Sequence, residues 1–531
     1  MVHSFRLSCL IAALVACVLV LAGSVQADPP YWHRMVVDSG GSGCGRYCSL
    51  AFDPNGDPAI VYIDGEGAGV SGGDLVCSRL DRESGVWNTS VIPSPNHLGR
   101  CTLKFQPNGY PAVSFAHLAP NDLWGIGYAW EDAGGWNVRE SIYDMSVYAP
   151  PLGRVALGFD GSGGPWVAES IDFLTLAFIV YATPETSPGG DWAIGIADHT
   201  AAGPTYGLGQ VSLAMGPTGW PRISYDMVPY AGYFPMKYAS YDPPAPIDPN
   251  VQWPNQVIYA PDPNEGMDPN TMTGYPCLAF DGAGTPSVAC TWHEKIGVQW
   301  SDWIAWAVRD VGGWTITKIT DEISLDANDV CCLAFRGDGK PGITFRGAHE
   351  GQNKPLMYAW LDPNDVWQIR SVDWIGDVGR YHSLGTDPNG LPAVAYYDAT
   401  EGLLIYAETS DVPDTYTLTL GTTQGGGTVE ADPNVNPDWG AYAYGTVVTL
   451  TGVPDENRAF SRWLIYDPNH PSDPNHAAQD SNNPTQILMD RDRQVDAVFI
   501  CVTGGGLGLP LGFTMLVLAL AKVGVRTREF C

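Results

Sequence analysis

The feature that most constrains this fold is a short motif that recurs along the first 400 or so residues. The motif begins with a leucine, has a glycine six positions later and a proline eight positions later, and its internal spacing never varies. Self-similarity at a fixed period is typical of repeat architectures, in which each repeat is one supersecondary unit. The leucines are Leu50, Leu103, Leu157, Leu213, Leu278, Leu333 and Leu384.

Each unit of the repeat has the pattern of short strands joined by turns. In the first unit an apolar stretch, 49–52, precedes an Asp-Pro-Asn-Gly sequence at 53–56, whose residues suit tight reversal and positive φ. The next stretch, 59–63, alternates in the manner of a β-strand. Later units show a strand with an aromatic pattern, as at 357–360, and one with a single tryptophan, such as Trp367. Four antiparallel strands in a period of about 50 residues describe one blade of a β-propeller.

The seventh unit predicts how the ring closes. No tryptophan strand follows its third strand, 403–409, whereas a strand of that kind, 31–37, is left over near the N-terminus. Pairing the two would leave no open sheet edge. We therefore predict an all-β fold over residues 28–410, a seven-bladed β-propeller with four-stranded blades in which the N-terminal strand closes blade 7. The 62 glycines and 43 prolines agree with this prediction, because both residues break helices.

The units have the form Ser-Leu-x-x-Asp-x-x-Gly-x-Pro, as in Ser49–Pro58. In this they resemble bacterial secreted propeller proteins of the sialidase-like group, also described as BNR or Asp-box-like. The full Asp-box pattern, Ser-x-Asp-x-Gly-x-Thr-Trp, is not matched. The resemblance therefore implies an architecture and does not by itself imply an activity.

A second domain is predicted over residues 414–500. Its segments 416–420, 425–429, 444–450 and 495–499 match, in order, the bacterial surface repeat related to the internalin B-repeat. An insertion at 467–475 departs from that pattern as an extra loop. The resemblance implies a small all-β module that acts as a stalk or spacer on surface proteins.

Both ends of the chain have the pattern of targeting segments. Residues 1–27 combine Arg6, an apolar run and small residues at a cleavage position, which predicts a secretory signal peptide. A lipoprotein box ending at Cys17 is the alternative. Residues 504–531 combine glycines, a short apolar stretch and a basic tail, which predicts a C-terminal sorting or transmembrane segment, with a buried terminal strand or helix as the alternative. We expect a secreted protein held at the cell surface or outer envelope, with the membrane as a partner through this segment.

Charge and cysteine content narrow the possible partners. The chain has 58 acidic and 27 basic side chains, a net charge of −31, which argues against nucleic acid as a partner. An even number of cysteines in an exported chain favours disulfides. No zinc-type spacing occurs among them, and we predict no metal and no cofactor. The disulfide candidates form two groups of four, Cys44, Cys48, Cys77 and Cys101, then Cys277, Cys290, Cys331 and Cys332.

Chemically versatile residues recur at one end of the predicted blades. Because strands alternate in direction, residues just before the first strand and just after the second lie on the same face, at one mouth of the central channel, where a ligand site is expected. Before first strands stand Arg46, Arg100, Arg154, Arg380 and His382, and after second strands stand Asp64, His117, Glu169, Asp226, Trp292, His293, Glu294, Arg346 and Asp398. Structural alternatives remain open: the arginines could tie blades together by pairing with Asp64 or Asp398, Trp292 could be packing, and His117 could be a satisfied loop histidine.

Three classes of function fit this pattern. The first is a binding or adhesion protein whose mouth recognises an extracellular glycan or protein. The second is a sialidase-like glycoside hydrolase, in which clustered arginines clamp a carboxylate and an acid pair cleaves the glycosidic bond. The third is a purely structural envelope protein. The arginines stand at different offsets from the repeat leucine, four residues before it for Arg46 and three for Arg100, which favours binding or structure over catalysis.

Overall fold

The computed structural model describes residues 31–40, 44–65, 73–93, 97–118, 124–145, 155–173, 176–201, 210–226, 236–241, 252–259, 271–296, 299–321, 323, 331–348, 353–420, 426–435, 441–466 and 477–501. The predicted signal peptide and C-terminal segment lie outside these residues. Within them, no helix has the length and apolar character needed to cross a bilayer. The chain divides into two compact units, Met1–Asp411 and Val412–Cys531.

The first unit consists of seven four-stranded antiparallel sheets. Blade 1 consists of β2 (Arg46–Phe52), β3 (Pro58–Asp64), β4 (Asp74–Asp81) and β5 (Val86–Ile92). Blade 2 consists of β6 (His97–Phe105), β7 (Pro111–Leu118), β8 (Trp124–Asp132) and β9 (Gly135–Met145). Blade 3 consists of β10 (Ala156–Phe159), β11 (Pro165–Phe173), β12 (Leu176–Pro184) and β13 (Trp192–Ala201). Blade 4 consists of β14 (Val211–Met215), β15 (Pro221–Asp226), β16 (Met236–Ser240) and β17 (Asn255–Tyr259). Blade 5 consists of β18 (Thr271–Phe280), β19 (Pro286–Ile296), β20 (Gln299–Asp310) and β21 (Gly313–Thr320). Blade 6 is β22 (Cys332–Phe335), β23 (Pro341–Arg346), β24 (Leu356–Leu361) and β25 (Trp367–Asp373).

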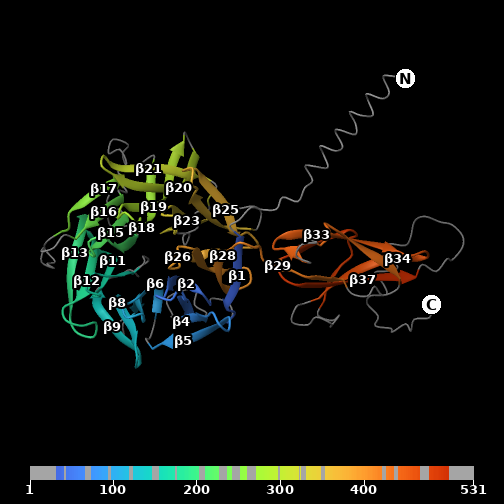
Figure 1. Cartoon of the computed structure of the whole chain (residues 1–531), viewed down its shortest axis with the longest axis horizontal. Helices are drawn as coiled ribbons and strands as arrows, with labels where there is room; N and C mark the ends of the chain where they lie inside the picture. The colour runs from blue at the N-terminus through green and yellow to red at the C-terminus, as the bar shows by residue number, and fades with distance from the viewer. Residues whose placement is uncertain are drawn as a thin grey trace, which may run out of the picture. The chain divides into compact units, whose positions relative to one another are not determined.

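Blade 7 is built from both ends of the unit. Its strands are β26 (Arg380–Thr386), β27 (Pro392–Asp398), β28 (Leu403–Ser410) and β1 (Tyr31–Asp38), and β1 pairs antiparallel with β28. Trp32 lies opposite Thr409, and Met35 lies opposite Tyr406. The predicted seven-bladed propeller, closed by its N-terminal strand, is therefore confirmed. Figure 1 shows first strands β2, β6 and β26 near the centre of the ring and fourth strands β5, β9 and β13 at its periphery.

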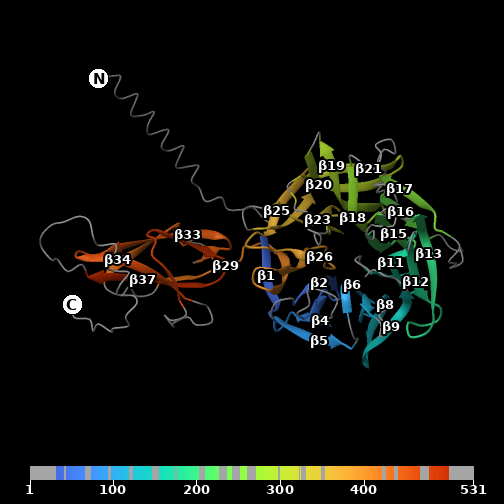
Figure 2. The same cartoon turned by 180° about the vertical axis from the view of Figure 1, so that it is seen from behind.

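The inner strands are linked around the ring by hydrogen bonds that explain the Ser-Leu pair of the repeat. The amide of Leu103 donates to the hydroxyl of Ser49 in the preceding blade at 3.0 Å, and the amide of Leu50 donates to Ser383 of blade 7 at 3.0 Å. Inner strand β2 thus contacts β6 on one side and β26 on the other. Figure 2 shows these three strands side by side from the opposite direction.

The Asp-Pro-Asn-Gly sequences form the turns between first and second strands. The carboxylate of Asp53 accepts the amides of Asn55 and Asp57 at 2.8 and 2.9 Å, and Gly56 adopts a φ of 95°. A left-handed conformation of this kind favours glycine, which accounts for the invariant glycine of the motif.

A second contact between blades uses buried tyrosines of the second strands. Tyr225 of blade 4 donates to Asp198 on the outer strand of blade 3 at 2.7 Å, and Tyr62 of blade 1 donates to Asp38 on the outer strand of blade 7. Apolar side chains fill the rest of each interface between blades. Blades 1 and 4 are therefore held to the preceding blade by core packing and by a hydrogen bond from a tyrosine of their second strand.

The structure corrects the prediction of disulfides, because none of the eight candidates is in a disulfide: Cys44, Cys48, Cys77, Cys101, Cys277, Cys290, Cys331 and Cys332. The reason is their position on the blades, where several of them bond to the backbone of the adjacent blade. The thiol of Cys48 donates to the carbonyl of Tyr381 at 3.0 Å, that of Cys101 to Tyr47 at 3.2 Å, and that of Cys331 to Tyr275 at 3.3 Å. Burial raises the pKa of Cys77 to about 11 and that of Cys290 to about 12, so these thiols stay protonated.

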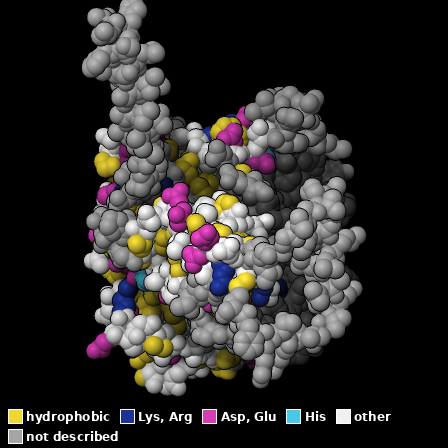
Figure 3. Space-filling view, turned by 90° about the vertical axis from the view of Figure 1, so that its right-hand side faces the viewer, with side chains coloured by type: hydrophobic (Ala, Val, Ile, Leu, Met, Phe, Trp, Pro, Cys, Tyr) yellow, Lys and Arg dark blue, Asp and Glu magenta, His cyan; other side chains and the backbone are white. Residues whose placement is uncertain are grey.

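The second unit is a small all-β module. Its strands are β29 (Thr415–Tyr416), β30 (Leu418–Leu420), β31 (Gly427–Asp432), β32 (Tyr442–Ala443), β33 (Thr446–Pro454), β34 (Arg458–Ile465), β35 (Ala478–Asp480), β36 (Thr485–Met489) and β37 (Arg493–Cys501). They form the sheets β31-β33-β36, β30-β37-β34-β35 and β29-β32. Trp463 is fully buried at its centre and donates from Nε1 to the carbonyl of Asn482 at 2.8 Å. Figure 3 shows one face of the molecule on which the acidic side chains of described residues are dispersed among polar and apolar ones.

Candidate functional site

The starts of the inner strands and the ends of the second strands meet at one end of the ring, the mouth. The register of blade 1 shows this directly, because Arg46 lies opposite Ile63, next to Asp64 at the end of β3. In blade 7, Arg380 lies opposite Tyr397, next to Asp398 at the end of β27. We call the part of the mouth formed by blades 6, 7 and 1 the mouth sector. It is defined by Arg346, Asp377, Arg380, Tyr381, Asp398 and Tyr47.

Two of the predicted arginines converge on one carboxylate in this sector. Arg346, at the end of β23, is fully buried; its Nη2 pairs with Asp377 and its Nε donates to the carbonyl of Val378 at 3.2 Å. Arg380, at the start of β26, contacts the other oxygen of Asp377 through Nη2 at 2.6 Å. Asp377 thus joins a guanidinium of blade 6 to one of blade 7. Arg346 and Arg380 therefore tie blades 6 and 7 together through Asp377.

Asp377 was not predicted from the sequence, because it lies in the segment between blades 6 and 7, outside the repeated motif. Its backbone amide donates to the hydroxyl of Thr400 at 2.7 Å, and the amide of Thr400 donates to Asp398 at 2.8 Å. Burial raises the pKa of Asp398 to about 6, against the lowering effect of the amides of Glu401 and Thr400. Asp377 and Asp398 therefore belong to one hydrogen-bonded network at the mouth.

Two tyrosines of the mouth sector adopt a conformation that is rare for a bulky side chain. Tyr47 and Tyr381 have φ values of 56° and 55°, and Tyr275 of blade 5, also three residues before its repeat leucine, has 53°. Non-glycine residues in this region are uncommon, and outliers of this type gather at functional sites. Each of the three stands where the register between first and second strand shifts. The sequence contained a signal for this feature, because a tyrosine recurs three residues before the repeat leucine in these three blades.

The rings of Tyr47 and Tyr381 lie together between blades 1 and 7. Their centroids are 4.5 Å apart with an interplanar angle of 51°, and both side chains are half-buried. Arg380, whose side chain is 35% exposed, directly precedes Tyr381 in the chain. The mouth sector thus combines an aromatic pair with a partly exposed guanidinium and carboxylate.

Three predicted residues form a separate cluster on blade 5. Trp292, His293 and Glu294 are consecutive residues of β19. They lie opposite Trp303, Asp302 and Ser301 of β20, respectively. His293 Nδ1 lies 2.9 Å from Asp302 Oδ1, and Lys318 pairs with Glu294 while its Nζ lies 5.5 Å from the centre of the Trp292 ring. Trp292 is buried against Tyr259, with ring centroids 4.4 Å apart. The packing interpretation of Trp292 is therefore the one that its surroundings favour.

Glu169 and Asp226 lie inside interfaces between blades. Glu169 is completely buried, both its oxygens are without a hydrogen-bond partner, and burial raises its pKa well above the usual value. In blade 3, Val167 lies opposite the repeat leucine, and Glu169 comes two residues later. Tyr396 occupies the equivalent position in blade 7. Burial also raises the pKa of Asp226 to about 7, although this carboxylate accepts the amide of Gln210.

The remaining predicted residues are spread around the ring. His117 is buried on β7 opposite Gly125, with its ring 6.1 Å from that of Phe115. His382 is buried, with Nδ1 3.0 Å from the carbonyl of Gly379. Burial, and then the charge of Asp38, raise the pKa of the half-buried Asp64. Arg154 and the side chain of Arg100 lie outside what the structure describes.

Among the described residues, no group of three or more His, Cys, Asp and Glu side chains is placed to hold a metal ion. In the mouth sector, Arg380 can donate and Asp377 can accept hydrogen bonds, the rings of Tyr47 and Tyr381 can stack, and Asp398 can exchange a proton.

The family of the divergent InlB B-repeat domain matches residues 416–502 of this chain. This finding agrees with the B-repeat-like identification of the second unit. The sialidase-like resemblance of the first unit stays a prediction. None of the curated proteins matches this chain.

Several solved propeller structures are similar to the chain. The polysaccharide lyase Uly1 aligns with a TM-score of 0.45 and 10% identity over 73% of this chain and 93% of its own. An alpha-L-arabinanase of Penicillium chrysogenum, complexed with arabinobiose, aligns with a TM-score of 0.41 and 13% identity over 71% and 97%. AofleA from Arthrobotrys oligospora aligns with a TM-score of 0.37 and 14% identity over 65% and 91%.

Proposed function

We propose that this protein is an exported, surface-retained binding protein whose propeller recognises uncharged polar saccharides at the mouth sector. The observations that carry the proposal are the half-buried ring pair of Tyr47 and Tyr381, and the ion pair between Asp377 and Arg380, the residue directly before Tyr381 in the chain. Aromatic rings accept the apolar face of a sugar, while a few placed polar groups fix its orientation. The second unit, similar to a bacterial surface repeat, would hold the propeller away from the envelope.

The charges of the mouth sector favour a neutral ligand. Asp377 already neutralises part of the charge of Arg346 and Arg380, and Arg346 is too deeply buried to reach a ligand. An arginine clamp on a substrate carboxylate, as in the sialidase-like alternative, would need those guanidiniums directed outward. The net charge of −31 also disfavours polyanions.

A glycan array probed with the full chain tests the proposal, and blade 5 supplies a matched control. Tyr381→Ala should weaken saccharide binding at least tenfold, whereas Tyr275→Ala removes a tyrosine with the same backbone conformation from another blade and should leave binding unchanged. Equal losses in both variants, or no loss in Tyr381→Ala, would contradict a site at the mouth sector.

Export and surface retention need a separate test. Protease treatment of intact bacterial cells that express the chain should digest the propeller, and N-terminal sequencing should locate cleavage near Ala27. A chain that keeps Met1 and stays protected until lysis would contradict this part of the proposal.

A hydrolytic role is the second candidate, because a carboxyl with a pKa of about 6 is suited to act as a general acid. Asp398 is the residue that we would assign to it. Incubating the saccharides that bind with wild type and Asp398→Asn, and measuring new reducing ends, separates the two roles. Release by wild type that Asp398→Asn abolishes would establish hydrolysis, and no release by wild type would leave binding alone.

A further inference from the structure

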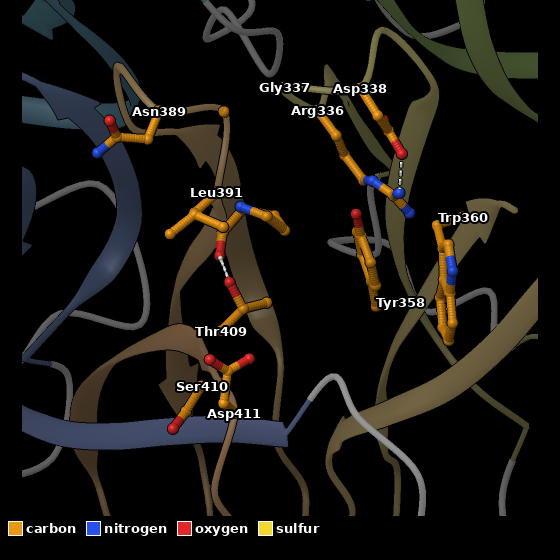
Figure 4. Close-up of a pocket in the computed structure, with 12 residues that line it drawn as sticks. Arg336, Gly337, Asp338, Tyr358, Trp360, Asn389, Leu391, Thr409, Ser410 and Asp411 are labelled. Atoms are coloured by element: carbon orange, nitrogen blue, oxygen red, sulfur yellow. Dashed lines mark hydrogen bonds and ion pairs between the residues drawn. The ribbon is translucent and has the colours of Figure 1, made fainter. Parts of the chain in front are cut away.

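A cavity of about 560 Å³ lies between blades 6 and 7 at the end of the ring opposite the mouth (Figure 4). One wall carries Arg336 and Asp338 from the turn before β23 and Tyr358 and Trp360 from β24. The other wall carries Ser410 and Asp411, where the chain leaves blade 7. We call this cavity the seam groove.

The sequence departs from the repeat at this groove. In blade 7 the first turn residue is Asp387, whose carboxylate accepts the amides of Asn389 and Leu391 at 2.9 and 2.8 Å. In blade 6 the same position is Arg336, although the turn still closes through the amide of Gly339 and the carbonyl of Arg336 at 2.9 Å. The Arg336 side chain does not cap the turn; it pairs with Asp338 and faces Tyr358, as Figure 4 shows.

The aromatic wall contains a buried polar group. Tyr358 is 1% exposed, and its hydroxyl makes no hydrogen bond of ordinary geometry, although the guanidinium of Arg336 lies beside it. Its ring stacks on Trp360 with centroids 5.6 Å apart and an interplanar angle of 14°.

The way in which the ring closes explains why the groove occurs at this interface. In blade 6 a turn of residues 362–366 joins β24 to β25, but in blade 7 no hairpin joins β28 to β1, because β1 comes from the other end of the unit. Ser410 and Asp411 therefore take the place of a hairpin turn. At the turn end the backbones of Gly337 and Gly390 meet directly, the amide of Gly337 donating to the carbonyl of Gly390 at 3.0 Å.

The geometry points to a second saccharide site: we infer that the seam groove binds one or two neutral sugar units. Within the aromatic wall, Trp360 is 9% exposed and can contact the apolar face of a sugar ring. Arg336, Asp338, Ser410 and Asp411 offer donors and acceptors to its hydroxyls. The groove has one cation and two carboxylates, which disfavours sugar acids. Its volume lies within the range of small-ligand pockets. The inference shares its ligand class with the proposed function but uses a different site.

The repeat itself supplies the variant that tests the groove. Arg336→Asp installs the residue that blades 1, 3, 5 and 7 have at this position, so the variant should fold. Gln106→Asp makes the same change in blade 2 and serves as the matched control. The probes are maltose, cellobiose and lactose, with a disaccharide of glucuronic acid as the charged comparison, and binding to the full chain is measured by saturation-transfer NMR and equilibrium dialysis.

We expect Arg336→Asp to weaken binding of at least one neutral disaccharide tenfold or more, with Gln106→Asp equal to wild type and the charged disaccharide not bound in the groove. Tyr381→Ala should leave this component intact, since it alters the mouth. The inference is overturned when wild type binds none of the neutral probes or when Arg336→Asp binds them as wild type does. If Tyr381→Ala alone abolishes binding, the mouth site stands and the groove does not.

Discussion

Tyr396 of blade 7 donates its hydroxyl to Asp373 of blade 6 at 2.7 Å, and both side chains are buried. The same relationship joins Tyr225 to Asp198 and Tyr62 to Asp38. In all three pairs the aspartate follows the tryptophan of an outer strand by six residues, as Asp373 follows Trp367. The contact is thus a repeated connection between one blade and the next.

Removing the Tyr396 hydroxyl should destabilise the propeller. Tyr396→Phe leaves Asp373 with one partner fewer in a buried site, which should lower the free energy of unfolding by about 1–3 kcal/mol. Chemical denaturation followed by circular dichroism measures the change. The double variant Tyr396→Phe/Asp373→Leu removes both polar partners and should lose less than the two single losses added together; strict additivity would argue against the pair.

Glu169 should reduce stability as the pH rises. Its folded-state pKa is raised above the unfolded value, so its protonated form is the stable one at low pH, and stability is lost as pH increases from about 4, the unfolded pKa, toward the folded one. Glu169→Met should therefore raise the melting temperature at pH 8 by more than at pH 4, with a gain of about 1 kcal/mol or more at pH 8. Glu185→Met, at an exposed acid, is the control. An equal gain at both pH values would show that ionisation of Glu169 is not the cause.

The two arginines on Asp377 should differ in their contribution to stability. Arg346 is fully buried, and breaking a buried ion pair costs about 3–5 kcal/mol, a loss that the remaining contact of Arg380 with Asp377 should reduce. Arg380 is 35% exposed, so its pair is screened and Arg380→Met should cost about 1 kcal/mol or less. Unfolding of Arg346→Met and Arg380→Met in urea compares them, and an equal or larger loss for Arg380→Met would contradict this assignment.

The eight cysteines of the propeller should be reduced but slow to react. Alkylation of the unfolded chain without reductant, followed by peptide mass spectrometry, should label all eight, whereas the folded chain should react slowly at Cys77 and Cys290, where burial raises the thiol pKa to about 11 and about 12. Peptides linked in pairs and two mass units lighter would show disulfides instead.

Much of the fold could be predicted because the repeat specifies it locally. The turn aspartates, the positive-φ glycines and the unmatched strand at 31–37 each correspond to a feature that the structure contains. The disulfides could not be predicted in this way, because spacing along the chain does not reveal which thiols face one another. Cys48 and Cys101 instead donate to carbonyls of neighbouring blades.

The candidate site was predicted only in part, for a related physical reason. The position of Arg346 and Arg380 at the mouth followed from strand direction, but their shared partner Asp377 lies in a connecting segment with no periodicity. The tyrosine offset recurs in three blades, yet its meaning depends on a left-handed backbone that the residue type alone would not suggest.

A crystal structure of the full chain with the saccharide that binds best on the array tests the central claim most directly. The account predicts a sugar ring against Tyr47 and Tyr381, with its hydroxyls within hydrogen-bond distance of Arg380 or Asp377. A saccharide held on the blade 5 cluster of Trp292, or an empty mouth in a saturated crystal, would contradict it.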